Sequence, residues 1–114
     1  MWLRAFILTQ LVELPIYAWA LGRPGAPCRA LWLRALAAFG ASASTHPLVW
    51  MTTGRLASVL GFWPAAAIIE LGVVGVEALY FRLWRLQRAL LWALAANAAS
   101  FGAGLILGEL GLFA

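Results

Sequence analysis

The chain has 114 residues, of which 65% are hydrophobic and 11% charged, and its formal net charge is +4. A soluble domain carries about a quarter charged residues, so the composition argues against a soluble protein and for an all-α membrane protein. The basic residues are all arginines and flank apolar stretches. Because no basic surface remains outside these stretches, nucleic-acid binding is excluded.

Four apolar stretches follow one another, and each is long enough for the ~20 residues of helix that a bilayer core requires. The first ends at the Gly- and Pro-rich segment 22–27, and the second ends before a turn at 52–55. The third begins at Trp63-Pro64, where proline suits a first helical turn, and a short basic connection at 83–87 follows it. The sequence predicts a single integral membrane domain over 1–114, an antiparallel bundle of four transmembrane helices at about 2–21, 30–50, 63–82 and 88–112.

The arginines are distributed unequally between the two ends of these helices. The second end of the bundle, with the turn at 52–55, has only Arg4 and Arg55. Because arginine in short loops marks the cytoplasmic side, we expect a bacterial inner-membrane protein with both termini in the periplasm. The first and third connections carry the others: Arg23, Arg29, Arg34, Arg82, Arg85 and Arg88.

The two halves of the chain resemble each other. Residues 35–42 are similar to residues 93–100, and Val12-Glu13-Leu14 is similar to Ile69-Glu70-Leu71 at nearly the same offset. This pattern would make two tandem helical hairpins in the same orientation, a parallel repeat of the kind that some transporters show.

Each predicted helix has one polar stripe at helical spacing. Charged side chains inside a membrane are costly and usually face the bundle interior, so the four stripes are expected to converge. From their depths we expect a polar ladder, an elongated path rather than one compact site. Gly104 and Gly108 continue the stripe of the fourth helix as a small-residue ridge that is expected to pack inside the bundle. The candidate binding residues are Gln10, Glu13, Tyr17, His46, Glu70, Glu77, Asn97 and Ser100.

Three interpretations of these stripes stay open. A proton- or cation-linked transport or channel component would use Glu13, Glu70 and Glu77 as titrating groups, with His46 as an entry group. A non-catalytic small subunit of a larger membrane complex would use polar residues only to hold helices together. An intramembrane enzyme that binds metal or lipid is third, although no nucleophile motif or phosphate-binding loop occurs.

Partners and cofactors follow from the same features. Glutamates and a histidine are plausible metal ligands, but the Glu-x-x-His pairing of helical two-metal sites is absent, so no cofactor is expected and the metal question stays open. The lipid bilayer is the first partner. Because a bundle of this size encloses little volume, we also expect a homo-oligomer or a larger membrane complex.

The overall format is similar to that of the small multidrug-resistance transporters. The length, the four predicted spans and the single glutamate of the first span, Glu13, carry this resemblance. The resemblance is one of format and not of family membership. The pair Glu70 and Glu77 in the third span departs from the pattern of that family, as do the other motifs of this span.

Overall fold

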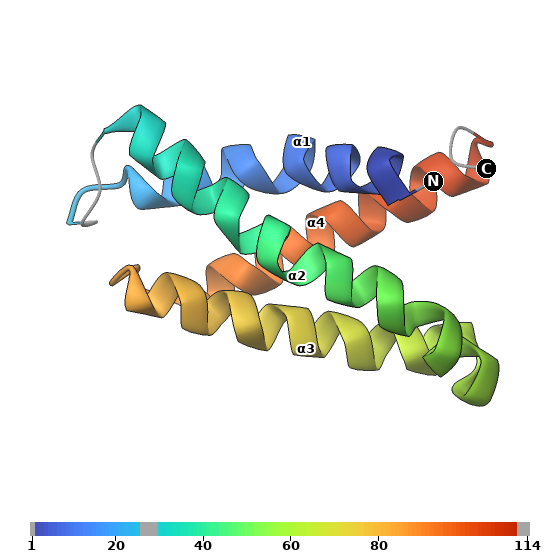
Figure 1. Cartoon of the computed structure of the whole chain (residues 1–114). Helices are drawn as coiled ribbons and strands as arrows, with labels where there is room; N and C mark the ends of the chain where they lie inside the picture. The colour runs from blue at the N-terminus through green and yellow to red at the C-terminus, as the bar shows by residue number, and fades with distance from the viewer. Residues whose placement is uncertain (1, 26–29, 112–114) are drawn as a thin grey trace.

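The computed structural model of the chain describes residues 2–25 and 30–111, and over these residues it is a four-helix all-α bundle (Figure 1). The predicted helical content is therefore confirmed. The helices are α1 (Trp2–Leu21), α2 (Leu31–Leu60), α3 (Phe62–Leu83) and α4 (Ala89–Glu109).

Consecutive helices run in opposite directions, and both termini lie at the same end of the bundle (Figure 1). The contacts between helices form a ring, in which α1 touches α2 and α4, and α3 touches the same two helices. Along the bundle the partners change. At the end with the α3–α4 turn, α2 lies beside α1, whereas at the end with the termini α2 lies beside α3 and α4 beside α1 (Figure 1).

The predicted end of the second helix is wrong. Helix α2 continues through the expected turn at 52–55 to Leu60, and the chain reverses at Gly61, whose φ of 85° suits glycine. Thr52 and Thr53 donate their hydroxyls to backbone carbonyls of the preceding turn of α2, so they fit within the helix. A single glycine such as Gly54 costs a helix only ~1 kcal/mol, and the helix propensity of the residues after it outweighs this cost.

The predicted end of the fourth helix is also too late. Helix α4 ends at Glu109, and Gly111 follows with a φ of 72°. Part of the expected extension, Leu112, lies outside the described residues. The other predicted boundaries agree with the structure to within one residue.

The bundle divides into two parts of different packing. We call residues 13–45 and 74–97 the closed half, and residues 2–12, 46–73 and 98–111 the open half. Among the described residues, the buried ones all belong to the closed half except Ala65. In the open half the α1/α4 pair and the α2/α3 pair diverge toward the end with the termini (Figure 1).

Small side chains explain the tight packing of the closed half. Helices α2 and α4 present alanines to the interior, including Ala37, Ala41 and Ala96, and alanine lets helix backbones approach closely. At Gly40 the approach is closer still, since a Cβ there would lie 2.7 Å from the Tyr80 hydroxyl oxygen. That hydroxyl donates to the Ala37 carbonyl oxygen at 2.9 Å and so ties α3 to α2.

Two of the four helices, α3 and α4, are long and apolar enough to cross a membrane. Over the described residues, α1 and α2 do not combine the length and the hydropathy that a membrane span requires. Polar residues lower their hydropathy: α1 contains Arg4, Gln10 and Glu13, and α2 contains Arg34 and Arg55 among several hydroxyl side chains. Large apolar side chains are nevertheless exposed on all four helices.

Candidate functional site

Glu13 is the first buried carboxylate of the site. It lies near the middle of α1, and only 1% of its surface is exposed. Ser42 of α2 donates its hydroxyl to Oε2 at 2.8 Å, and Ser100 of α4 donates to Oε1 at 2.6 Å. Each carboxylate oxygen therefore has one hydroxyl partner, and the two partners come from the two helices that flank α1.

Glu77 of α3 is the second buried carboxylate, and it is also 1% exposed. Its Oε2 accepts hydrogen bonds from the Tyr17 hydroxyl at 2.6 Å and from the Asn97 amide at 2.8 Å. Thr45 lies 3.3 Å from the other oxygen, Oε1. The amide nitrogen of Asn97 also donates to the Ala93 carbonyl oxygen at 2.9 Å, which fixes the orientation of this side chain.

These residues form one site, which we call the polar network: Glu13, Tyr17, Ser42, Thr45, Glu77, Asn97 and Ser100. All four helices contribute to it, and the two carboxylates interact electrostatically. Within the described part of the chain, no arginine lies against either carboxylate. The donors are hydroxyls and an amide, so the charge of an ionised glutamate here would be balanced by neutral dipoles alone.

The hydroxyl partners can serve either protonation state of the carboxyls. A hydroxyl both donates and accepts, whereas an ionised carboxylate only accepts. Thr45 and Ser100 have a second acceptor within reach, the carbonyl oxygens of Ala41 and Asn97 respectively. When a glutamate carries a proton, the hydroxyl can turn to that carbonyl and accept from the carboxyl group.

An aromatic pair closes the network toward the closed half. The rings of Tyr17 and Phe81 lie 4.1 Å apart between centroids, and neither side chain is exposed. Leu21 and Leu86 lie beyond them in the same apolar core. These buried side chains lie between the network and the end with the α3–α4 turn.

On the opposite side the network borders a cleft in the open half, formed by two adjoining pockets that share Glu70 and Phe101. The first pocket, about 270 Å³, lies between α1, α3 and α4 and reaches Ser100. The second, about 250 Å³, lies between α3 and α4 and reaches Asn97. The cleft therefore touches a partner of each buried carboxylate.

Glu70 of α3 differs from the two buried glutamates, Glu13 and Glu77. It is only partly buried, and it makes no hydrogen bond within the described residues. Its carboxylate lines both pockets of the cleft, beside the aromatic residues Trp63 and Phe101. Glu70 is thus the acidic residue that a molecule entering the cleft meets before it reaches Glu13 or Glu77.

Two candidate residues stand apart from the network. His46 accepts a hydrogen bond from Trp50 Nε1 at 3.0 Å, and its ring packs 5.3 Å from that of Phe6. It is not a partner of Glu13 or Glu77. Gln10 lies one turn before Glu13, and its amide atoms are shielded from solvent without a hydrogen-bond partner in the described residues.

The expected role of Gly104 and Gly108 is wrong. A Cβ at either position would meet nothing within 4 Å, so these glycines are not places where helices of this chain approach closely. The reason is the divergence of the helix pairs, which moves α2 and α3 away from this part of α4. Gly104 instead lines the cleft.

The structure brings together part of the expected ladder, since Glu13, Tyr17, Glu77, Asn97 and Ser100 belong to the polar network, whereas Gln10, His46 and Glu70 lie outside it. Thr45, which sequence reasoning did not name as a site residue, belongs to it. The sequence did indicate this position, because Thr45 follows Ser42 by three residues and therefore lies on the same face of the helix. Among the described residues, no group of three histidines, cysteines or acidic residues could hold a metal ion.

Comparison with protein-family models, with curated proteins and with solved structures finds no match to this chain.

Proposed function

We propose that the chain is a four-span membrane protein that takes up protons or a cation at Glu13 and Glu77 and acts as a component of proton- or cation-linked transport. The observation that carries this proposal is the pair of fully buried carboxylates held only by neutral donors. A carboxylate paired with arginine is held in its charged form. A carboxylate among hydroxyls and an amide can gain or lose a proton, or exchange it for a cation, without breaking an ion pair.

Placement in the membrane is supported by the surface of the bundle. Monomeric soluble proteins rarely expose large continuous apolar patches, whereas here large apolar side chains, leucines among them, are exposed on every helix. The arginine-rich end would face the cytoplasm and the termini the periplasm of a bacterial inner membrane. In that orientation the cleft lies on the periplasmic side of the buried carboxylates, and the aromatic pair of Tyr17 and Phe81 lies on their cytoplasmic side.

The geometry suggests an order of events. A proton or cation enters the cleft, meets Glu70 and passes to Glu13 through Ser100 or to Glu77 beside Asn97. Neutralising Glu77 removes the charge that the Tyr17 hydroxyl stabilises. Since Tyr17 also forms the aromatic pair with Phe81, loading of the site and opening of the closed half would act through the same side chain.

Flux measurements in reconstituted vesicles test this function. We expect Glu13→Gln and Glu77→Gln to abolish proton or cation flux, because glutamine keeps the size of the side chain but cannot titrate. Glu70→Gln, at the cleft, should reduce flux in part. The matched control is Glu109→Gln, since Glu109 is exposed at the end of α4 and its variant should retain wild-type flux.

The outcome that contradicts the proposal is equally clear. If Glu13→Gln and Glu77→Gln both fold, by circular dichroism and gel filtration in detergent, and both retain wild-type flux, titration at these positions has no part in transport. A pH-sensitive dye, a sodium-sensitive dye and an organic cation, tested in parallel vesicles, identify the transported species.

A non-catalytic small subunit is the second candidate function. The open half favours it, because Gly104 and Gly108 lie uncovered on α4 and the cleft beside them is unfilled by this chain. A helix of a larger membrane protein, or of a second copy, would pack closely at such glycines. Purification in mild detergent distinguishes the two functions, since a subunit would copurify with a larger protein and would show no flux alone.

A further inference from the structure

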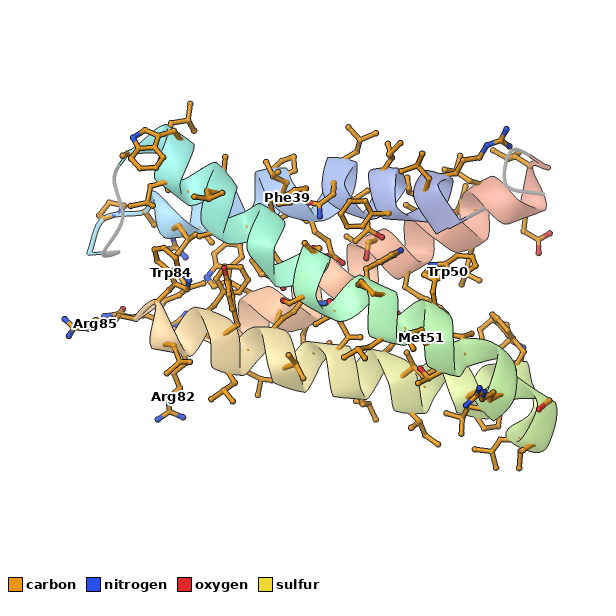
Figure 2. The ribbon with its side chains drawn as sticks, viewed as in Figure 1. Phe39, Trp50, Met51, Arg82, Trp84 and Arg85 are labelled. Atoms are coloured by element: carbon orange, nitrogen blue, oxygen red, sulfur yellow. The ribbon has the colours of Figure 1, made fainter. Side chains whose placement is uncertain are left out.

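The end of the closed half carries a concentration of positive charge that the transport site does not use. Figure 2 shows Arg82 and Arg85 extending from this end away from the bundle. The described acidic residues do not balance this charge, because they are buried in the network or lie in the open half. The described arginines at this end are Arg23, Arg34, Arg82, Arg85 and Arg88.

The turn between α3 and α4 holds its arginines in a fixed backbone. Leu86 is buried, and its N–H donates to the Phe81 carbonyl oxygen at 2.9 Å, which anchors the middle of the turn. Arg85 and Arg88 flank it with φ angles of 62° and 56°. Residues with a Cβ rarely adopt this left-handed conformation, and strained positions of this kind cluster at functional sites. Glycine or asparagine would suit the backbone better, so the side chains are the reason for arginine.

Arg23 approaches the same turn from the end of α1. Its guanidinium lies 5.4 Å from the ring centroid of Trp19 and 5.5 Å from that of Trp92. The two indole rings pack edge to face at 5.4 Å. Cation–π attraction therefore holds Arg23 beside α4, where it faces the N-terminal end of that helix.

A small pocket of about 220 Å³ lies between these elements. Arg23, Gln87 and Arg88 line it together with Trp92, and none of its described lining residues is acidic. It is smaller than the roughly 300–1,000 Å³ of pockets for drug-sized ligands. Two guanidinium groups and a side-chain amide suit a phosphate group, since arginine and amide N–H groups are its usual partners.

A second, larger groove of about 590 Å³ adjoins the first on the outer face of α3 and α4. Leu86, Gln87 and Arg88 belong to both. The floor of the groove is apolar, with Gly75, Ala78, Leu79, Ala89 and Leu90, and Arg82 lies at its rim. An apolar groove that ends at arginines matches a molecule with a hydrocarbon chain joined to an anionic group.

We propose that this end of the bundle binds an anionic phospholipid, with its phosphate between Arg23 and Arg88 and an acyl chain in the groove between α3 and α4. The inference rests on the membrane placement in the proposed function but not on transport. Basic pockets between helices on the cytoplasmic side are known to hold anionic headgroups. The positive charge of the pocket complements an anionic headgroup, and Arg88 lines both this pocket and the groove for the acyl chain. These two observations favour an anionic phospholipid as the occupant.

Native mass spectrometry of the purified protein in neutral detergent tests the proposal, with phosphatidylglycerol and phosphatidylcholine of identical chains as probes. We expect the wild type to bind phosphatidylglycerol in preference. Arg23→Gln and Arg88→Asn should each weaken that binding about fivefold, and the double variant about thirtyfold. Asparagine is chosen at position 88 because it tolerates the left-handed backbone.

Matched variants keep the test decisive. Arg55→Gln, which removes an exposed arginine of the open half, should leave the preference unchanged. If it weakens binding as much as Arg88→Asn, or if the wild type binds both lipids equally, the site does not exist. If soluble glycerol 3-phosphate displaces the lipid at equal concentration, the ligand is a free phosphate compound and the lipid proposal is wrong. If Arg88→Asn does not fold, Arg82→Gln on the helix surface takes its place in the binding measurement.

The same experiment separates this inference from the transport proposal. Glu77→Gln should bind phosphatidylglycerol like the wild type, because Glu77 is buried in the network away from both grooves. If Glu77→Gln loses flux but still prefers phosphatidylglycerol, the lipid site is independent of transport. Loss of lipid preference in the arginine variants, with flux retained in phosphatidylcholine vesicles, would leave transport standing.

Discussion

The two halves of the bundle differ in what their helices present to each other. In the closed half, alanines from α2 and α4 form one buried cluster with Tyr17 and Phe81. In the open half, the same helices diverge and leave the cleft that Glu70 lines. The buried carboxylates lie where the two halves meet. Residue size along the helices therefore decides where this bundle packs tightly, and the polar network lies at the boundary, beside the cleft.

The largest difference between the halves should appear on truncation of a phenylalanine. Phe81 is fully buried in the closed half, and Phe62, in the same helix, is half exposed in the open half. We expect Phe81→Ala to lower the free energy of unfolding by about 3–5 kcal/mol, and Phe62→Ala to change it by less than ~0.5 kcal/mol. Equal losses for the two variants, measured by denaturant unfolding in detergent micelles, would show that the open half is packed as tightly as the closed half.

Removal of a donor from the polar network should have an intermediate effect. Asn97→Leu keeps the number and branching of the side-chain heavy atoms but deprives Glu77 of an amide hydrogen bond of 2.8 Å. We expect a loss of about 1–3 kcal/mol in the free energy of unfolding, because a buried carboxylate loses a partner. The control is Thr52→Ala in the open half, where the hydroxyl bonds only to its own helix and its loss should be within ~0.5 kcal/mol.

The smallest expected effects come from glycines, and they should have opposite signs in the two halves. Gly104→Ala should stabilise the protein by up to ~1 kcal/mol, since alanine is the better helix former and the space beside it is open. Gly40→Ala should destabilise it by about 1 kcal/mol or less, because displacing the Tyr80 hydroxyl breaks the hydrogen bond to Ala37 and the gain in helix propensity offsets only part of that loss. Thermal melts of both variants in detergent measure the difference. A stabilising Gly40→Ala would mean that Tyr80 moves aside without cost.

The internal similarity of the chain shows what a sequence pattern can predict and what it cannot. Residues Ser42 and Ser100 occupy equivalent positions in the two similar segments, and both donate to Glu13. Glu70, the equivalent of Glu13, receives no such pair and lies at the cleft instead. Equivalent residues thus have different environments, so the pattern predicted the helix faces but not the partners.

The sequence by itself determined that the chain forms four helices, and it determined which face of each helix is polar. Helical periodicity fixes the face on which a side chain lies, and so Glu13, Tyr17, Glu77, Asn97 and Ser100 could be named in advance. Glycine and proline marked the end of α1, and proline marked the start of α3. Glycine alone did not end α2 at position 54, because its cost is small beside the propensity of the residues around it.

Only the tertiary structure decided which polar residues meet. The angle at which α2 and α4 run, each exchanging one neighbouring helix for another between the two ends of the bundle (Figure 1), depends on packing between residues far apart in the chain. It buries Glu13 and Glu77 while leaving Glu70 at a cleft, brings Thr45 to Glu77, and leaves His46 with Trp50 and Phe6. Periodicity carries no information about that angle, because it describes one helix at a time.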